Sequence, residues 1–339
     1  MIRILENISL KNFNTFGVEV KARYFAVISC YDELRSLIQE RKPAEKKLLI
    51  MGGGSNLLFT GDFNGLILRN EIKGIEIVEE TDQHVFVKVG GGENWSDFVD
   101  STVRKGWGGL ENLSLIPGTA GAAPVQNIGA YGVEQKDAFV SLEACNLTTG
   151  KICTYNRLEC NFGYRSSLFK TAEKGKWCVL NIIYRLQKKP ELNLGYAPLR
   201  KAFEDKPSEQ ITIKAVCDAV KNIRRSKLPD PQTLGNAGSF FKNPVIGKEK
   251  FNRLQRKFPK IPFYRLKNGN VKIPAGWLIE QCGWKGKRVG NAGVHHLQAL
   301  VIVNLGGATG EEILQLANAI QYDVSQQFGI GLEPEVLIL

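Results

Sequence analysis

Residues 113–132 read LSLIPGTAGAAPVQNIGAYG, and their apolar residues follow neither the 3.6-residue period of a helix nor the two-residue period of a strand. Glycine, alanine and proline crowd this stretch. Such a segment has no regular structure of its own to hold it in place. We therefore expect that neighbouring structure or a bound group holds it.

A shorter loop of small residues comes earlier in the chain. Residues 47–51 (KLLIM) are typical of a short buried strand, and residues 52–57 (GGGSNL) follow at once. A peptide backbone approaches a diphosphate or a flat ring closely only where side chains are absent, and unpaired amides in a turn bind anions. The two loops together favour a nucleotide cofactor. The alternative is that each loop is only a tight turn.

Neither loop matches an ordinary nucleotide-binding motif. Position 57 is leucine, so the first loop lacks the third glycine of the GxGxxG dinucleotide fingerprint. The P-loop pattern GxxxxGK[ST] occurs nowhere in the sequence. The sequence therefore disfavours a Rossmann dinucleotide site and a P-loop.

The same order of strand, glycine turn and helix recurs after the first loop. Val85, Val87 and Val89 alternate as in a half-buried strand, and three glycines follow them. Gly106 would end the helix that comes next. The apolar residues on one face of that helix are Trp95, Phe98, Val99 and Val103.

The rest of the chain predicts a mixture of helices and strands. The predicted helices are 31–41, 213–225, 274–282 and 309–328. The predicted strands are 138–147, 152–155, 177–186 and 332–339. Pro274 would stand in the first turn of its helix, while Thr309 and Glu312 form a capping box and Gly329 ends the last helix. The turn at Pro229 and Pro231 predicts a domain boundary.

The composition is that of a globular protein with a sizeable core. Of the 339 residues, 43% are apolar and 23% charged, and this length is typical of two or three domains. The longest apolar run, at 297–303, is far shorter than the ~18 residues of a membrane helix. No apolar segment follows a basic amino terminus. We expect a soluble, cytoplasmic protein that binds no membrane.

The cysteines and histidines form no ligand pattern. None of the seven cysteines forms a CxxC pair, and two of the three histidines, His295 and His296, are adjacent. Adjacent rings cannot easily bind one metal ion together. We expect reduced thiols and no metal.

The net charge of +11 predicts attraction of polyanions or phosphate-bearing ligands. The densest basic cluster consists of Arg224, Arg225 and Lys227. Three charges are fewer than the basic stripe of a typical nucleic-acid-binding surface. We therefore expect no nucleic-acid partner.

Three motifs carry groups suited to chemistry. Ser239 lies between a glycine and two phenylalanines, where its hydroxyl could face a substrate; the alternative is a helix or turn cap, and no GxSxG elbow makes it a nucleophile. Arg165 could clamp a carboxylate through two parallel hydrogen bonds or form a surface salt bridge. Glu333 and Glu335 flank Pro334 and would share one face of a strand, where one could handle a proton or both could be solvated.

Ten blocks of sequence, taken in order, resemble the family of UDP-N-acetylenolpyruvoylglucosamine reductases, also called MurB. The resemblance runs nearly from end to end of the chain. The blocks are 14–17 (NTFG), 53–57 (GGSNL), 109–113 (GLENL), 116–118 (IPG), 124–132 (PVQNIGAYG), 162–165 (FGYR), 227–229 (KLP), 238–244 (GSFFKNP), 275–279 (AGWLI) and 332–336 (LEPEV). Residues 194–199 (LGYAPL) also resemble the tyrosine loop of the longer of the family's two subtypes.

The resemblance implies an α+β fold. Its parts would be a two-part FAD-binding fold of the vanillyl-alcohol-oxidase type and a third α/β domain that binds the substrate. The implied FAD-binding subdomains are 1–70 and 71–226, and the substrate-binding domain is 227–329. The last strand, at 330–339, is expected to return to the first subdomain.

The resemblance also implies an NADPH-dependent oxidoreductase of peptidoglycan precursor synthesis with noncovalently bound FAD. In this family NADPH gives a hydride to flavin N5, and the flavin passes it to C3 of UDP-N-acetylenolpyruvoylglucosamine. Negative charge then develops at C2 and on the substrate carboxylate, where preorganised positive charge stabilises it. By the family motifs, Arg165 and Glu335 hold and polarise this carboxylate. Ser239 delivers the proton to C2, and the product is UDP-N-acetylmuramate.

Further binding residues are implied by matched positions. The implied FAD-binding residues are Gly52, Gly53, Gly54, Ser55, Asn56, Leu57, Ile116, Pro117, Gly118, Gly121, Ala122, Ala123, Gln126, Asn127, Gly129, Ala130, Tyr131 and Arg224. The implied substrate-binding residues are Tyr196, Lys227, Asn243, Tyr264, Lys285 and Gln298. Ala122 and Ala123 replace a pair that often contains serine in relatives, so backbone amides must bind the diphosphate there.

Two other classes of function stay open on the sequence. A related flavin oxidase would use the same loops, but it needs a histidine or cysteine for covalent attachment, and histidine is scarce. A basic, non-enzymatic nucleotide- or nucleic-acid-binding protein would hold no flavin, and its binding would weaken steeply with salt. The sequence has no helical zipper pattern, so we expect a monomer.

Overall fold

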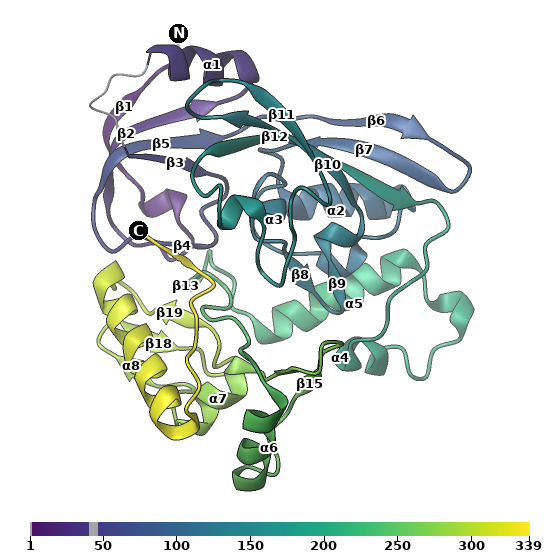
Figure 1. Cartoon of the computed structure of the whole chain (residues 1–339), viewed down its shortest axis with the longest axis vertical. Coiled ribbons are helices and arrows are strands. Elements are labelled where there is room, and N and C mark those ends of the chain that lie inside the picture. Colours follow the sequence, from purple (N-terminus) through teal and green to yellow (C-terminus); the bar gives the residue numbers. More distant parts are fainter. Residues whose placement is uncertain (1, 41–46) are drawn as a thin grey trace. The chain divides into compact units, whose positions relative to one another are not determined.

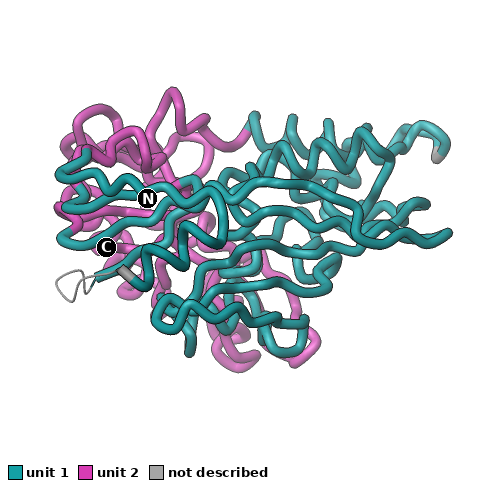
Figure 2. Tube along the Cα trace, turned by 90° about the horizontal axis from the view of Figure 1, so that it is seen from above, with its two compact units in different colours: residues 1–8, 22–53, 64–226 teal, residues 9–21, 54–63, 227–339 magenta. Residues whose placement is uncertain are grey.

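The computed structural model describes residues 2–40 and 47–339 (Figure 1). It consists of two units, coloured separately in Figure 2. Unit 1 comprises residues 1–8, 22–53 and 64–226, and unit 2 comprises residues 9–21, 54–63 and 227–339. The last segment of unit 2 starts at the boundary predicted after residue 226. The division into three domains stays a prediction.

A four-stranded sheet lies largely in unit 1. In sheet order its strands are β1 (Leu5–Ser9), β2 (Lys21–Ile28), β5 (Phe63–Asn70) and β3 (Leu48–Met51). Helix α1 (Tyr31–Glu40) buries Leu34 and Leu37 in one core cluster with residues of β2 and β5. The predicted strand at 47–51 and the predicted helix at 31–41 are confirmed, although Arg41 lies outside the described residues.

A five-stranded antiparallel sheet forms the larger part of unit 1. In sheet order its strands are β11 (Ile152–Asn156), β10 (Phe139–Asn146), β12 (Trp177–Gln187), β7 (His84–Gly90) and β6 (Ile75–Glu80). Val85, Val87 and Val89 are fully buried, as their alternation predicts. The strands predicted at 138–147, 152–155 and 177–186 correspond to β10, β11 and β12 and are confirmed.

Helix α2 (Trp95–Arg104) follows β7 and buries its apolar face in the same core. The rings of Trp95 and Phe98 lie 5.8 and 5.7 Å from that of Tyr184 in β12. The side chain of Asn94 caps the helix by accepting a hydrogen bond from the Asp97 amide. Gly106 follows the helix with a φ of 75°, as expected for a residue that ends it.

The stretch at 113–132 is held by the turn that starts α2. The Trp95 indole donates to the Leu113 carbonyl at 2.9 Å, and the Trp95 amide donates to the Gly118 carbonyl at 3.1 Å. The Gly121 amide donates to the Gly91 carbonyl at 2.8 Å. The stretch at 113–132 contains two short elements, α3 (Ala122–Val125) and β8 (Gly129–Ala130). Strand β9 (Val133–Glu134) follows directly after it. Neighbouring structure therefore holds this irregular stretch, as its composition predicts.

Unit 1 ends with two helices that share a small core. Helix α4 (Ala197–Lys201) contributes Leu199, and α5 (Ile213–Lys227) contributes Val216 and Val220. The helix predicted at 213–225 is confirmed and is two residues longer. Short 3₁₀ turns occur at Lys11–Phe13, Glu111–Leu113, Gln135–Asp137, Leu168–Lys170 and Ser208–Gln210.

Unit 2 consists of short strands and three longer helices. One sheet has the order β13 (Gly235–Asn236), β19 (Ile302–Asn304), β18 (Ala292–Val294) and β17 (Arg288–Val289). A second has the order β14 (Val245–Ile246), β16 (Val271–Lys272) and β15 (Tyr264–Arg265). The helices are α6 (Lys248–Lys257), α7 (Ala275–Gln281) and α8 (Gly310–Phe328).

The ends of α7 and α8 follow from their capping residues. Thr309 and Glu312 form the predicted capping box of α8, and Gly329 ends this helix in the left-handed conformation at a φ of 64°. Helix α7 is also confirmed, with one correction. Pro274 is the residue before the first helical residue, not a member of the first turn, because its ψ of 114° is extended.

The strand predicted at 332–339 is wrong over most of its length. Only β20 (Leu337–Ile338) forms, and it pairs in parallel with β4 (Leu57–Leu58). Pro334 makes an isolated antiparallel bridge to Phe241. The ladder does not continue past this bridge, because the Phe240 amide donates to the Leu300 carbonyl and the Glu335 carbonyl accepts from the Asn56 side chain. The partner of β20 does lie within residues 1–70, to which this end of the chain was expected to return.

The described thiols form no disulfide bond. All seven cysteines are free, and four of them, Cys145, Cys160, Cys178 and Cys217, are buried. In the described ranges no group of three histidine, cysteine or acidic side chains could hold a metal ion. None of the helices in those ranges is both long and apolar enough to cross a membrane.

The contact of Gly91 with β12 gives a first prediction. An added Cβ at Gly91 would lie 2.3 Å from the Val179 carbonyl oxygen. Gly91→Ala should therefore lower the free energy of unfolding by about 1–3 kcal/mol, as overpacking does elsewhere. Urea unfolding of Gly61→Ala is the control, because a Cβ there has no neighbour within 4 Å. Equal losses in the two variants would contradict the packing argument.

Candidate active site

The two loops of small residues touch each other in unit 1. An added Cβ at Gly52 would lie 2.3 Å from the Thr119 hydroxyl oxygen, and one at Gly53 would lie 3.2 Å from the Gly118 Cα. A larger residue at either position would push the loops apart. The structure therefore brings Gly52 and Gly53 together with Gly118, three of the residues expected to bind FAD.

Amide groups in these loops are available to an anion. In unit 1, the N–H group of Gly53 donates to no acceptor in the described part of the chain. The same holds, within those residues, for Gly118 and Thr119. Successive unpaired amides in a turn form a concave donor site for phosphate oxygens. These loops therefore fit the diphosphate of FAD.

Asn127 has a structural part in this region. Its side-chain amide donates to the Glu134 carboxylate at 3.0 Å and to the Gly163 carbonyl at 2.9 Å. Its side-chain oxygen accepts from Gln135 at 3.3 Å and from the Lys136 amide at 3.4 Å. The side chain is fully buried and satisfied by the protein. Asn127 thus joins the irregular stretch at 113–132, which we name the cofactor loop, to the loop that carries Arg165.

Arg165 lies against the cofactor loop. Its guanidinium donates to the Gly129 carbonyl, and its Cζ lies 5.4 Å from the centre of the Tyr164 ring. Its φ of 51° is in the left-handed region, which is uncommon for a side chain of this size. The structure therefore aims Arg165 at Gly129, a residue expected to bind FAD.

Tyr131 and Arg224 form a second contact beside the cofactor loop. The Tyr131 hydroxyl is hydrogen-bonded to the Arg224 side chain, and Arg224 Nε donates to the Leu115 carbonyl at 3.1 Å. Burial raises the pKa of Tyr131, an effect that the Arg224 charge opposes, and burial lowers the pKa of Arg224. The ring of Tyr196 lies edge-on to that of Tyr131, with centroids 5.1 Å apart. Unit 1 thus joins the expected tyrosine loop to two expected FAD-binding residues.

Ser239 and Glu335 become neighbours in unit 2. The Glu335 amide donates to the Phe240 carbonyl at 2.8 Å, and the Lys242 amide donates to the Glu333 carbonyl at 2.9 Å. These bonds pair residues 240–242 with residues 333–335, so Ser239 directly precedes the residue bonded to Glu335. The Ser239 hydroxyl has no hydrogen-bond partner among the described residues, so it caps no helix or turn there.

The two glutamates beside Pro334 have different surroundings. Glu333 is exposed over 75% of its side chain and pairs with Lys242 at 3.0 Å. Glu335 is half-buried, and its carbonyl accepts from the Asn56 side chain at 3.2 Å. The solvated surface carboxylate is therefore Glu333. Proton handling by Glu335 stays a prediction.

Asn243 and Gln298 lie close to the Ser239 segment. The Asn243 side-chain oxygen accepts from the Ala275 amide at 2.9 Å, at the start of α7. The Phe240 amide donates to the Leu300 carbonyl at 2.9 Å, two residues beyond Gln298. An added Cβ at Gly276 would lie 3.0 Å from the Gln298 side-chain oxygen. The start of α7 therefore joins both side chains to the segment that carries Ser239.

Three other expected substrate-binding residues make contacts that do not involve Ser239. Lys285 pairs with Glu280 at 2.9 Å. Tyr264 is 52% exposed, with Lys272 Nζ 5.6 Å from its ring centre. Lys227 is the exposed last residue of α5. No hydrogen bond or ion pair given for the described residues connects these three to Ser239.

Asn112 was missed on the sequence as a residue of this region. It is buried, and its side-chain amide donates to the carbonyls of Tyr131 and Asn193, both at 2.9 Å. Its side-chain oxygen is buried without a hydrogen-bond partner in the described chain. The available signal was its place in the block 109–113 (GLENL), one of the blocks that resemble the family.

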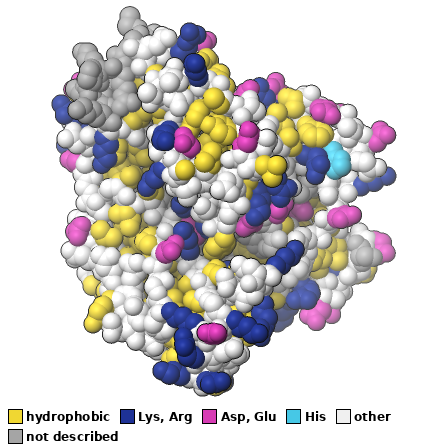
Figure 3. All heavy atoms as spheres, viewed as in Figure 1, with side chains coloured by type: hydrophobic (Ala, Val, Ile, Leu, Met, Phe, Trp, Pro, Cys, Tyr) yellow, Lys and Arg dark blue, Asp and Glu magenta, His cyan; other side chains and the backbone are white. Residues whose placement is uncertain are grey.

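Basic side chains gather on α6 in unit 2. Figure 3 shows this dark blue group at the bottom of the view. The basic residues of this helix are Lys248, Lys250, Arg253, Arg256 and Lys257, with a single acidic residue, Glu249. Of the basic residues at 224–227, Arg224 is directed inward, because its Nε donates to the Leu115 carbonyl.

Comparison with known proteins identifies two domain families. The family model described as an FAD binding domain matches residues 22–156. The model of the C-terminal domain of UDP-N-acetylenolpyruvoylglucosamine reductase matches residues 230–339. The crystal structure of UDP-N-acetylenolpyruvylglucosamine reductase from Thermus caldophilus aligns with a TM-score of 0.70 and 24% identity, covering 100% of this chain and 99% of that one. The expected α+β fold with an FAD-binding part is confirmed.

Curated relatives extend this similarity to the whole chain. The UDP-N-acetylenolpyruvoylglucosamine reductase of Flavobacterium johnsoniae is 48% identical over 339 residues, which cover 100% of both chains. That of Amoebophilus asiaticus is 47% identical over 334 residues, which cover 98% of both chains. The chain therefore belongs to the UDP-N-acetylenolpyruvoylglucosamine reductase family, and it is an oxidoreductase with FAD as its cofactor.

Proposed function

We propose that this protein reduces UDP-N-acetylenolpyruvoylglucosamine to UDP-N-acetylmuramate in peptidoglycan precursor synthesis, with NADPH as the reductant. The observation that carries the proposal is the pairing of residues 240–242 with residues 333–335, in which the Glu335 amide bonds to Phe240, the residue after Ser239. A proton donor and a carboxylate are the groups that reduction of an enol ether beside a carboxylate needs. We further propose that the protein acts as a cytoplasmic monomer.

The cofactor is proposed to be held noncovalently by backbone amides. The donors in unit 1 are the amides of Gly53, Gly118 and Thr119, and Ala122 and Ala123 add no hydroxyl group. Bound FAD would supply the hydride-transfer chemistry, with NADPH as the hydride donor and the substrate as the acceptor. Residues 52–57 and 113–132 contain neither histidine nor cysteine, which supports noncovalent binding over the covalent attachment of a related oxidase.

Arg165 is proposed to bind the substrate carboxylate through its guanidinium, and Glu335 is proposed to bind it through a shared proton, since two charged carboxylates would repel each other. Negative charge develops on the substrate carboxylate once C3 has received a hydride and C2 carries the electron pair. A guanidinium forms two parallel hydrogen bonds to a carboxylate, and its fixed positive charge stabilises the developing charge. Contact of Arg165 with Gly129 would hold the guanidinium in a set direction before the substrate arrives.

Ser239 is proposed to deliver the proton to C2. Its hydroxyl makes no hydrogen bond to the described residues, so it is available to a ligand. Gly238, with a φ of 68°, and the buried Phe240 and Phe241 fix the backbone on both sides of it. A serine hydroxyl is a weak acid, so neighbouring groups must stabilise the alkoxide as it forms. Glu335 is a candidate for this role, because its amide bonds to Phe240, the residue that follows Ser239.

Both substrates are polyanions, and the charge of the protein suits them. The net charge is +11, and the basic residues of α6 form an exposed group in unit 2. A positive surface raises the rate at which anionic ligands are captured. This supports a diphosphate-bearing substrate and a phosphate-bearing reductant.

The cofactor proposal is tested by the visible absorption spectrum of the purified protein and by acid precipitation. We expect flavin bands, with FAD released into the supernatant by acid. Flavin that stays in the pellet would indicate a covalent oxidase. A colourless protein that added FAD cannot reconstitute would contradict the proposed site.

Ser239→Ala tests the proton donor. NADPH should bleach the flavin band at nearly the normal rate, because this half of the reaction needs no proton at C2. Reoxidation by UDP-N-acetylenolpyruvoylglucosamine should slow by about 10²–10⁴-fold, the usual contribution of a general acid. Stopped-flow absorbance measures both halves separately. Equal losses in the two halves would remove Ser239 from this role.

Glu335→Gln tests the carboxylate, and Glu333→Gln is the matched control on the other side of Pro334. The first variant should slow flavin reoxidation by about tenfold or more, because loss of a group that acts in the transition state lowers kcat. The control should change it less than twofold, because Glu333 is exposed and pairs with Lys242. A change only in substrate affinity would make Glu335 a binding group.

A further inference from the structure

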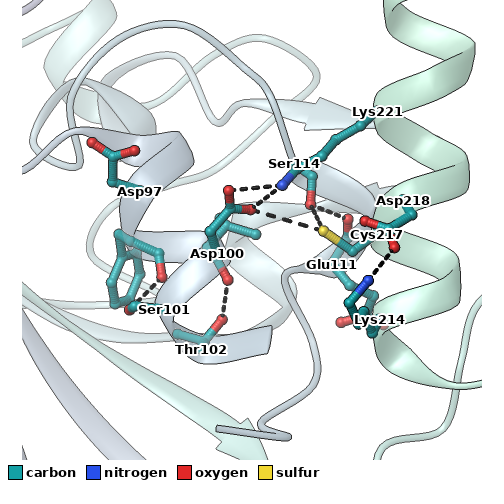
Figure 4. A network of polar contacts seen from close by, with 12 residues as sticks. Asp97, Asp100, Ser101, Thr102, Glu111, Ser114, Lys214, Cys217, Asp218 and Lys221 are labelled. Atoms are coloured by element: carbon teal, nitrogen blue, oxygen red, sulfur yellow. Dashed lines mark hydrogen bonds and ion pairs between the residues drawn. The ribbon is translucent and has the colours of Figure 1, made fainter. Parts of the chain in front are cut away.

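Helix α5 presents a row of polar residues toward the segment that leads into the cofactor loop. Cys217, Lys221 and Arg224 are spaced by four and three residues, so they share one face of the helix. Figure 4 shows Cys217 and Lys221 directed at Asp100 of α2 and at Ser114. The contacts of Cys217 and Lys221 take no part in the chemistry described above, so their role is still to be explained.

The contacts form a continuous chain. Lys221 Nζ lies 2.7 Å from the Asp100 carboxylate, and Cys217 Sγ lies 3.8 Å from an oxygen of the same group. Cys217 Sγ also lies 3.1 Å from Ser114 Oγ, which donates to the Glu111 carbonyl at 2.7 Å. Burial raises the pKa of the Cys217 thiol, so it stays protonated and can donate a hydrogen bond. We name Asp100, Ser114, Cys217 and Lys221 the α5 polar cluster.

Folding of α5 does not depend on these contacts alone. The helix buries Val216 and Val220 in a core with Leu199 and Phe203. The ion pair is largely shielded, since the side chains of Lys221 and Asp100 are 17% and 26% exposed. A shielded ion pair adds little net stability but holds its partners in one geometry. The cluster is therefore suited to fixing the positions of the segments it joins.

The segment at 111–115 is tethered at nearly every residue. The Leu113 carbonyl accepts from the Trp95 indole, and the Leu115 carbonyl accepts from Arg224 Nε. Leu115 has a φ of 58°, a conformation that leucine rarely adopts without outside support. The partly exposed residues 116–119 follow directly, and the amides of Gly118 and Thr119 donate to no acceptor among the described residues.

We propose that the α5 polar cluster positions the 115–119 turn and Arg224 for binding of FAD, with Asp100 and Lys221 as positioning residues. This inference rests on the proposed assignment of this turn to the cofactor. Loss of the Lys221 charge would release α5 from α2 and loosen Ser114. The Gly118 and Thr119 amides would then sample positions that fit the diphosphate less well.

The test measures release of FAD from the holoenzyme on dilution, followed by flavin fluorescence. Lys221→Met and Cys217→Val should each speed release by about tenfold, which corresponds to 1.4 kcal/mol of binding free energy. Cys217→Ser keeps a hydrogen-bond donor and should stay within about threefold of the normal rate. Lys214→Met is the matched control on the same helix: Lys214 pairs with Asp218 at 2.6 Å and is 77% exposed, so its loss should change release less than twofold.

A second readout separates positioning from general loss of stability. Hydrogen exchange of the amides at 115–119 should speed up in Lys221→Met, while that of β7 and β12 stays unchanged. Should this variant fail to fold, the double variant Asp100→Asn with Lys221→Met, which leaves no unpaired charge, replaces it with the same expected result.

Three outcomes would overturn the inference. Unchanged FAD release in Lys221→Met and Cys217→Val would do so while leaving the cofactor site intact. Release that rises only together with exchange of β7 and β12 would show a merely structural role. A wild-type protein that holds no FAD would contradict the proposed function itself, and the inference with it.

Discussion

Backbone packs directly against backbone at Gly53, Gly91 and Gly121, and the arrangement of unit 1 depends on this contact. The Gly121 amide bonds to the Gly91 carbonyl, while Gly53 lies against Gly118. No side chain separates these turns, so the end of β3, the start of α2 and the irregular stretch after it meet within van der Waals distance. The same absence of side chains leaves amides exposed to a ligand. Packing and cofactor binding are thus two results of one constraint.

Much of the fold was predictable because it follows from local periodicity. Helix α2 and the buried strand β7 are confirmed, since burial of an apolar face decides both. The end of α8 is confirmed at Gly329, since a left-handed cap favours glycine. The last strand could not be predicted correctly in this way. Its length depends on a distant partner, Phe241, and on the use of the Phe240 amide by the Leu300 carbonyl, and strand periodicity records neither.

The candidate site was predictable mainly through its resemblance to a family, and the structure adds which residues meet. Glu335 and Ser239 are almost a hundred positions apart, and only the bond between Glu335 and Phe240 makes them neighbours. Asn127 was expected to bind FAD, yet its side chain is fully used within the protein. Arg224 belongs to the densest basic cluster of the sequence, and in the structure its Nε donates to the Leu115 carbonyl. The sequence shows which residues are charged, but not where their side chains point, because packing determines the direction of each side chain.

The seven thiols have a practical consequence. Cys30 and Cys153 are exposed, whereas burial raises the pKa of Cys145 to about 11 and that of Cys160 to about 12. Only the thiolate reacts rapidly with an alkylating reagent, so at neutral pH the buried thiols are protected twice, by access and by protonation. In the native molecule the two exposed thiols would be alkylated first. The buried thiols would be alkylated only after local unfolding exposes them. Pulsed alkylation with mass spectrometry would therefore record local opening of the unit 1 core, without any engineered probe.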